Sequence, residues 1–291
     1  MPSGVVLGVL TAVSWGGADF LARFATRTLG SLRSVFWMQA WGALFVTILL
    51  LFAHDWGHLF DGSGWQPWAW GILAGTINTF AMLALYRAFE VGKLSLVGPV
   101  SGSYPALTVL LALLSGERLS AIRCIGIAVA LVGVLLVATG EKSAGSALAA
   151  KSRTVDGLGW AVAASLSFGF LFWLLGIRMI PRTGAIATVW LIRLTGAAIT
   201  LPIIICARLS LGVKSRQTTG QLYGMGFLDT AAFALSNLGM RLEQVSIVSV
   251  LGSLYGAVTV GLAAAFLKER ITTLQWIGIG SILGGVALIN L

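Results

Sequence analysis

Long apolar runs separated by short polar breaks make up most of the chain. A helix needs about 20 mostly apolar residues to cross the hydrocarbon core of a bilayer, and the runs have roughly this length. Charged residues, glycine and proline mark the breaks. The pattern predicts an all-α polytopic membrane protein with ten transmembrane helices, at 3–22, 33–53, 67–87, 94–115, 121–139, 157–177, 185–207, 221–240, 245–267 and 273–290.

The longest polar break divides the ten predicted helices into five and five. It spans 140–157 and reads GEKSAGSALAAKSRTVDG. We therefore expect a first five-helix unit at 1–140, a linker at 141–156 and a second unit at 157–291.

The two halves share a sequence pattern. GERLSAIRCIGIAVALVGVLL at 116–136 resembles KERITTLQWIGIGSILGGVAL at 268–288, and a similar shift aligns SWG at 14–16 with SFG at 167–169. The chain is therefore an internal duplication. Because five is an odd number of crossings, the second copy is expected to enter the membrane from the opposite side. Inverted repeats around a central cavity are typical of secondary transporters that work by alternating access.

Composition favours a membrane protein. The 291 residues are 57% hydrophobic and 10% charged, whereas soluble domains are about 25% charged. The net charge of +9 comes from basic residues that stand singly or in pairs, which argues against a nucleic-acid partner. Lys and Arg are most numerous in the loops after the odd-numbered predicted helices, and the positive-inside rule then puts both termini outside the cytoplasm.

The N-terminus and the cysteines suggest neither processing nor cross-linking. MPSGVVLGVLTAVSW has no basic region before its apolar run and no obvious cleavage site, so we expect an uncleaved first helix. Cys124 and Cys206 stand alone in apolar stretches. They are expected to be packing residues rather than parts of a disulfide or a metal site.

Three stretches resemble the EamA family of the drug/metabolite transporter superfamily, and the resemblance covers nearly the whole chain. They are SWGGADF, LYRAFEVGKLSLVGPVSGSYPALTVLLALLSGERL and KERITTLQWIGIGSILGGVALI. The resemblance implies an exporter of small metabolites in the cytoplasmic (inner) membrane, with amino-acid and aromatic-amino-acid exporters among the nearest analogues. It also implies a central cavity lined mainly by the first, third, fourth, sixth, eighth and ninth helices.

Two departures from the family pattern put strict functional symmetry of the halves in question. Lys268 stands where the family has glycine, and the prolines of the fourth predicted helix have no counterpart in the ninth.

The expected partners are a small-molecule substrate and the lipid bilayer, with protons as an open third partner. We expect no cofactor and take a monomer as the working oligomeric state.

Polar residues inside two predicted helices are the first candidates for a binding site. Burying an ionisable group at mid-helix costs roughly 2.5–3.5 kcal/mol on insertion scales, so such groups suggest function by default. Asp229 lies in the eighth predicted helix, followed at helical spacing by Phe233 and Asn237. On the matching face of the third predicted helix the duplication places Asn78, Met82 and Tyr86.

Three interpretations of Asp229 stay open. Asp229 and Asn78 would bind the ammonium or carboxylate of an amino acid between apolar neighbours. Alternatively, Asp229 pairs with an intramembrane arginine such as Arg193, while Asn78 hydrogen-bonds a neighbouring helix. A third interpretation makes Asp229 a proton carrier for antiport.

Aromatic residues extend the candidate site to the first and sixth predicted helices. Trp15 and its counterpart Phe168 are candidates because cavities for organic solutes are usually lined by aromatic side chains. Helix packing is the alternative role for both. Asp19 and Arg23 are four residues apart, which favours an ion pair at the helix end over a binding site.

The fourth predicted helix is expected to be a bent gate. Pro99 and Pro105 remove backbone donors and kink a helix, and the freed carbonyls must face protein or a water-filled cavity. We expect Ser101, Ser103 and Tyr104 to line this gate. In the ninth predicted helix we expect Ser253 and Tyr255 to line the gate. Gly252 and Gly256 would make this helix pliable, or would simply pack closely against a neighbouring helix.

Other classes of function are poorly supported. The loop HDWGHLFD, with His54, Asp55, His58 and Asp61, resembles a metal site in composition, but an interfacial loop explains it better. No phosphate-binding glycine-rich loop with lysine is present. An intramembrane protease would need a membrane-embedded histidine or two deep aspartates, so an enzyme is not expected. Facilitated export of amino acids and proton-coupled export of drugs or lipophilic cations both stay open.

Overall fold

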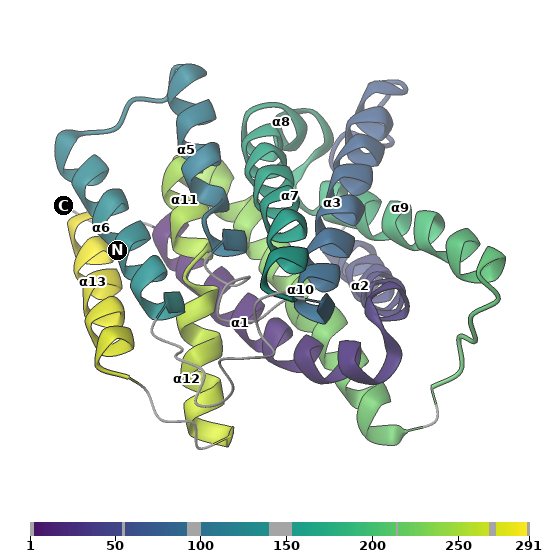
Figure 1. Cartoon of the computed structure of the whole chain (residues 1–291). Helices are drawn as coiled ribbons and strands as arrows, with labels where there is room; N and C mark the ends of the chain where they lie inside the picture. The colour runs from purple at the N-terminus through teal and green to yellow at the C-terminus, as the bar shows by residue number, and fades with distance from the viewer. Residues whose placement is uncertain are drawn as a thin grey trace.

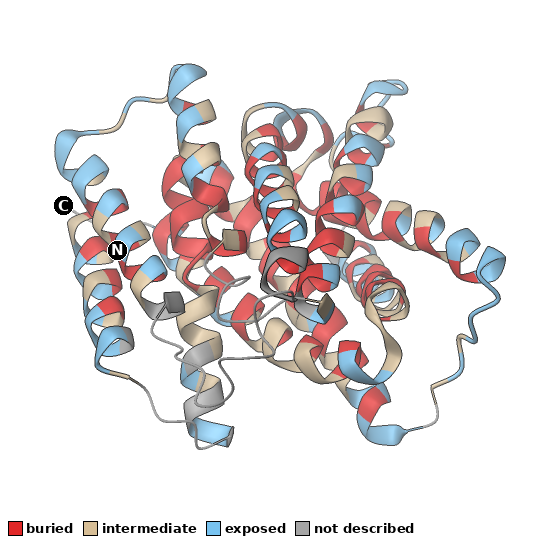
Figure 2. Ribbon diagram, in the orientation of Figure 1, coloured by how far each residue is buried: buried red, intermediate tan, exposed pale blue. Residues whose placement is uncertain are grey.

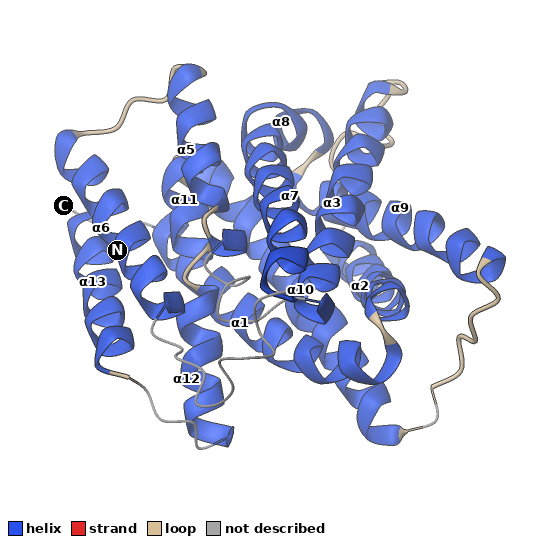
Figure 3. Cartoon of the chain, in the orientation of Figure 1, coloured by secondary structure: helices blue, strands red, loops and turns tan. Residues whose placement is uncertain are grey.

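The computed structural model describes residues 3–53, 56–91, 100–139, 153–213, 215–267 and 272–289. These residues form helices and loops without a strand (Figure 3). In the first half lie α1 (Ser3–Leu29), α2 (Ser31–Ala53), α3 (Gln66–Val91), α5 (Tyr104–Leu114) and α6 (Ala121–Thr139). In the second half lie α7 (Arg153–Leu174), the π-helical turn η1 (Leu175–Met179), α8 (Ile180–Thr183), α9 (Ala185–Cys206), α10 (Arg216–Leu242), α11 (Val245–Gly252), α12 (Tyr255–Leu267) and α13 (Thr273–Ile289).

The helices have the length and composition of membrane spans. Within the described residues, five helices are long and apolar enough to cross a bilayer, at 3–29, 31–52, 66–88, 157–183 and 185–206, and four shorter apolar helices accompany them. Large apolar side chains such as Phe52, Leu114 and Phe266 are exposed on their outer faces, as lipid contact requires. Buried positions concentrate in the helices at the centre of the molecule (Figure 2). The all-helical multi-pass fold is therefore confirmed, while the number of ten spans stays a prediction.

The first helix is longer than predicted. It continues from the expected end at residue 22 through Arg23 and Arg27 to Leu29, and Gly30 follows with a φ of 82°. Glycine adopts this left-handed conformation without the steric cost that a Cβ brings. The helix therefore ends at this glycine and not at the two arginines. Charged side chains near a helix end can reach the interface and need not mark a loop.

Two predicted helices are interrupted at equivalent positions. The fourth is broken at Ser103, after which α5 begins, and the ninth is broken at Ser253 and Leu254, between α11 and α12. In each break the serine hydroxyl donates to the carbonyl three residues earlier, at 2.7 Å for Ser103 and 2.8 Å for Ser253. Such bonds can satisfy carbonyls near a helix break, and at the first break the Val100 carbonyl also accepts from the backbone N–H of Ser103 at 3.4 Å.

Proline explains only one of these breaks. Pro105 lies in the first turn of α5, where proline is well tolerated, and Pro99 lies outside the described residues. The second break has no proline. The span predicted at 245–267 is covered by α11 and α12 together, and both breaks share a serine whose hydroxyl bonds the carbonyl three residues earlier.

Helix packing repeats when the halves are exchanged. α1 packs against α10 as α7 packs against α3, and α3 packs against α9 as α10 packs against α2. α2 contacts its counterpart α9, and α6 contacts its counterpart α13. Figure 1 shows α6 and α13 side by side at one edge of the molecule. The contacts thus follow a pseudo-two-fold relation between the halves.

The two similar stretches of sequence contact each other. A Cβ added to Gly126 of α6 would lie 2.9 Å from the carbonyl oxygen of Gly285 in α13. One added to Gly133 would lie 2.7 Å from that of Gly278. Small residues let helix backbones approach closely inside a membrane. The repeated glycines therefore build the contact between α6 and α13.

We expect Gly285→Val to destabilise the protein by about 1–3 kcal/mol, because overpacked contacts cost this much. The new side chain would meet the backbone of Ala130 and Gly126. Gly284→Val is the matched control, since a Cβ at this exposed neighbour meets nothing within 4 Å. Thermal unfolding in detergent measures both variants, and equal melting temperatures would contradict the assignment of this contact.

The cysteines correct one expectation. Cys124 of α6 and Cys206 of α9 are free and exposed on the surface of the chain, so neither packs in the core. A thiol behaves as a small apolar group, which suits a position facing lipid.

Candidate functional site

A small cavity lies among six helices in the centre of the molecule, and about 40 Å³ inside it is open to the centre of a water molecule. Its lining comes from α1, α3, α5, α7, α10 and α12, which correspond to the six helices that the family resemblance implies. The lining residues are Trp15, Asp19, Met82, Leu85, Tyr104, Phe168, Phe172, Asp229, Phe233 and Tyr255.

Most of the lining consists of counterpart positions from the two halves. A shift of 151 to 153 residues relates the members of each pair, which the printed sequence shows directly. The pairs are Trp15 with Phe168, Asp19 with Phe172, Met82 with Phe233, and Tyr104 with Tyr255. The cavity is therefore lined by equivalent positions of the two halves and lies where the halves meet.

Aromatic rings form a continuous wall. The centroid of the Trp15 ring lies 5.3 Å from both Phe172 and Phe233 and 6.5 Å from Tyr255, each in an edge-to-face arrangement. Tyr104 continues the wall, 5.1 Å from Phe172. Ring faces carry partial negative charge and attract cations, particularly where water is scarce. The wall suits both an apolar body and a positively charged group.

Asp229 is one of two carboxylates in the lining, and it is paired. Its Oδ2 lies 2.5 Å from Nη2 of Arg193, a residue of α9 whose side chain is fully buried. The guanidinium also donates from Nη1 to Oε1 of Gln39 at 2.8 Å and lies over the Phe233 ring, 5.0 Å from its centroid. Arg193 itself is not part of the lining. Of the three interpretations of Asp229, the pairing with Arg193 is the one that matches the contact in the structure.

Asp19 is the second carboxylate, and its position corrects an expectation. Instead of forming the ion pair with Arg23 that the sequence favoured, Asp19 faces the cavity from α1. Within the described parts of the chain no hydrogen bond or ion pair engages its carboxylate. Asp19 is thus the carboxylate that a bound solute could reach.

Several residues that the sequence predicted for the cavity hold helices together instead. Asn78 accepts from Nε2 of Gln39 at 3.3 Å, and Asn237 donates to the carbonyl of Ala185 at 3.0 Å. The Tyr86 hydroxyl points to the sulfur atoms of two methionines in α2 and α10, each 3.6 Å away. Also outside the lining are Ser101, Ser103, Ser253, Gly252 and Gly256.

The sequence contained signals for the lining residues that were missed. Phe172 follows Phe168 by four residues on one face of α7, and the shift that pairs Trp15 with Phe168 also pairs Asp19 with Phe172. Leu85 follows Met82 by three residues on α3. Helical spacing applied together with the duplication would have identified these positions.

Comparison with known proteins decides the family. A sequence model described as the EamA-like transporter family matches residues 2–139 and again residues 156–291. The chain belongs to the EamA-like transporter family. It is therefore a multi-pass membrane protein of a transporter family, and the family model covers each half of this EamA-like chain separately.

A solved structure agrees with this fold. A protein titled only "Crystal structure of protein" superposes with a TM-score of 0.79 at 19% sequence identity, covering 98% of the EamA-like chain and 96% of its own. At this identity the similarity shows the fold alone. A search among curated proteins found no match.

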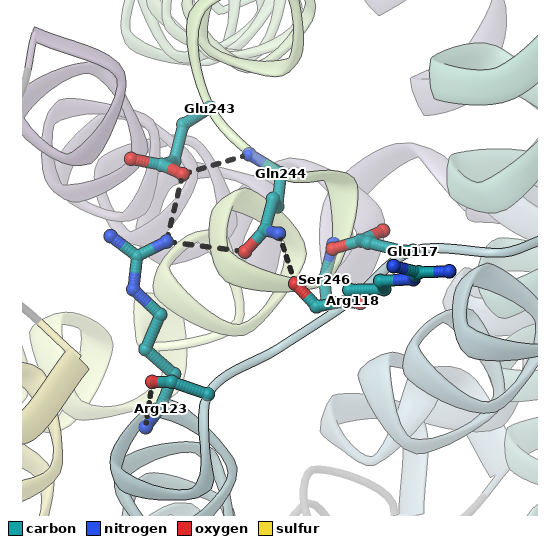
Figure 4. Close-up of polar contacts among 7 residues, drawn as sticks. Glu117, Arg118, Arg123, Glu243, Gln244 and Ser246 are labelled. Atoms are coloured by element: carbon teal, nitrogen blue, oxygen red, sulfur yellow. Dashed lines mark hydrogen bonds and ion pairs between the residues drawn. The ribbon is translucent and has the colours of Figure 1, made fainter.

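A polar cluster outside the cavity joins the two halves of the EamA-like chain (Figure 4). Glu117, in the loop before α6, accepts a hydrogen bond from the backbone N–H of Ser246 at 3.2 Å. Arg123 of α6 contacts Glu243 Oε1 at 3.3 Å and Gln244 Oε1 at 3.2 Å. The Gln244 amide donates to the carbonyl of Arg118 at 2.6 Å. The cluster ties the first copy of the repeated stretch to the turn between α10 and α11.

We expect Glu117→Ala to destabilise the protein by about 1–3 kcal/mol, since it leaves the buried N–H of Ser246 without an acceptor. Glu117→Gln is the control, because its amide oxygen keeps the contact.

Burial raises the pKa of the Glu117 carboxyl. The folded state then holds this proton more tightly than the unfolded state, so raising the pH through this raised pKa lowers stability in the wild type but not in the Gln variant. Thermal unfolding across pH measures both effects.

The described part of the HDWGHLFD loop contains a hydrogen-bonded pair of side chains. His58 Nδ1 lies 2.6 Å from Oδ2 of Asp61. Hydrogen bonds from Ser63 and His58 lower the pKa of Asp61 to about 2. His54 and Asp55 lie outside the described residues. Among the residues that the structure describes, no group of three or more potential metal ligands occurs.

Proposed function

We propose that this EamA-like protein carries small organic amines, solutes with an ammonium group on an apolar body, through the central cavity. The observation behind this proposal is the chemistry of the lining. It combines six aromatic side chains with the carboxylates of Asp19 and Asp229, and none of its ten residues is basic. Asp19 would bind the ammonium group, while the rings surround the apolar body and contribute cation–π attraction.

The same lining makes amino acids the second candidate. Their apolar or aromatic side chains suit the wall, and their ammonium group suits Asp19. Their carboxylate, however, would enter a site whose described lining offers no basic partner, since Arg193 is engaged by Asp229 and lies behind Phe233. A buried charge without a partner is costly, which favours amines and lipophilic cations over zwitterions.

Alternating access is the mechanism that the fold supports best. Helix packing repeats with the halves exchanged, as expected when one half rocks against the other around a central site. The broken helices supply candidate gates, because Tyr104 and Tyr255 follow the two breaks directly and line the cavity from opposite halves. Export and proton coupling are proposals that transport assays decide.

A matched pair of solutes tests the function. Proteoliposomes loaded with unlabelled tryptamine should exchange labelled tryptamine, whereas tryptophan, which differs by a carboxylate, should exchange more slowly. Repeating the assay with and without a pH gradient tests proton coupling. Exchange of tryptophan at an equal or higher rate would favour amino acids as substrates. Exchange of neither solute, nor of a panel of other amines, would contradict the proposed function.

A further inference from the structure

Four buried polar side chains form a chain that runs between the halves of the molecule. Asn78 accepts from Gln39 at 3.3 Å, Gln39 accepts from Arg193 at 2.8 Å, and Arg193 pairs with Asp229 at 2.5 Å. Asn78, Gln39 and Arg193 are fully buried. Only Asp229 reaches the cavity.

The chain is built from counterpart positions that carry different charges. Gln39 and Arg193 are each the ninth residue after the glycine that precedes their helices, Gly30 and Gly184. Asn78 and Asp229 are related by a shift of 151 residues, and each is followed by threonine. The first half thus contributes a neutral pair and the second half a charged pair, so the four residues carry no net formal charge.

Close packing fixes Arg193 in this place. Gly42 and Gly196 lie three residues after Gln39 and Arg193. A Cβ at Gly42 would collide with Thr230 and the Arg193 side chain, and one at Gly196 would collide with Gln39. The glycines make room for the two long side chains where α2 crosses α9.

The pairing determines the charge that the cavity presents. Asp19 and Asp229 together carry two formal negative charges, and Arg193 offsets one of them from behind the Phe233 ring. A solute therefore meets one uncompensated carboxylate. Charges several ångströms apart interact strongly in a site with little water, so this balance affects binding even without direct contact.

We propose that Arg193 is a specificity-determining positioning residue. Held between Asp229 and Gln39, it offsets one of the two cavity carboxylates and selects solutes with a single positive charge over dications. This inference rests on the proposed function, because it specifies which amines the same cavity accepts.

Three variants in nanodiscs test the inference, with 4-methylbenzylamine as the monoamine and 1,4-bis(aminomethyl)benzene as the size-matched diamine. Asp229→Asn keeps Asp19 but leaves Arg193 unpaired, so both amines should bind about tenfold more weakly. Arg193→Gln should shift the preference toward the diamine by about tenfold. The double variant with both changes restores the single charge of the site and should regain most of the monoamine affinity lost in Asp229→Asn.

The double variant keeps the test decisive even where Arg193→Gln alone does not fold. A double variant that binds the monoamine as weakly as Asp229→Asn would overturn the inference, as would a folded Arg193→Gln protein with unchanged preference. A purely structural role of Arg193 predicts no change in the ratio of the two affinities. Failure of the wild-type protein to bind either amine would instead reject the proposed function, so the two failures are distinguishable.

Discussion

Asp19→Asn is expected to weaken the binding of organic amines about a hundredfold, equivalent to about 2.8 kcal/mol. The change removes the one carboxylate of the cavity lining that no described side chain engages, while Asn keeps the size of the side chain. Binding of labelled tryptamine to purified protein in nanodiscs measures the effect. The melting temperature should change little, because no described hydrogen bond is lost.

Asp61→Asn is the matched control for this result. It removes one carboxylate from an exposed loop, 41% accessible at the side chain, far along the chain from the lining residues. Binding should be unchanged in this variant. Equal losses in the two variants would indicate a general effect of net charge, and full binding by Asp19→Asn would remove Asp19 from the site.

Trp15→Ala is expected to have the second large effect, on both stability and binding. Trp15 is buried and contacts three aromatic rings. Its truncation leaves a void, which for large aromatic residues costs about 3–5 kcal/mol. It also removes the central ring of the aromatic wall. Thermal unfolding and tryptamine binding measure the two consequences.

Trp15→Phe and Trp276→Ala separate packing from binding. Phe keeps an aromatic face and should retain most of the affinity for tryptamine, as cation–π attraction predicts. Trp276 is 60% exposed on α13, so its loss should affect neither property strongly. If Trp15→Ala bound tryptamine as tightly as the wild type, the aromatic wall would not be part of the site.

The sequence was sufficient to predict the fold class because its signals are long and repeated. Apolar runs of helical length require helices in a bilayer, and the two similar stretches established the duplication that helix packing now reflects. The break in the second half was missed because it depends on Ser253 bonding a carbonyl of its own helix. A short-range contact of this kind leaves no periodic signal.

The candidate site was only partly predictable for a similar reason. The register predicted Trp15, Met82 and Phe233 for the cavity, and these three side chains line it, because helical spacing fixes which residues share a face. It did not determine how far each side chain reaches. Asn78 and Asp229 occupy equivalent positions, yet only Asp229 lines the cavity, while Gln39 engages Asn78. Such differences depend on tertiary contacts between helices distant in sequence.

The most direct test of the account is the structure of the protein with tryptamine bound, determined by cryo-electron microscopy in nanodiscs. The account predicts density for the solute inside the central cavity, with its ammonium nitrogen about 3 Å from the Asp19 carboxylate and its indole against the aromatic wall. Density for tryptamine elsewhere, or in the cavity with the ammonium group directed away from Asp19, would contradict it.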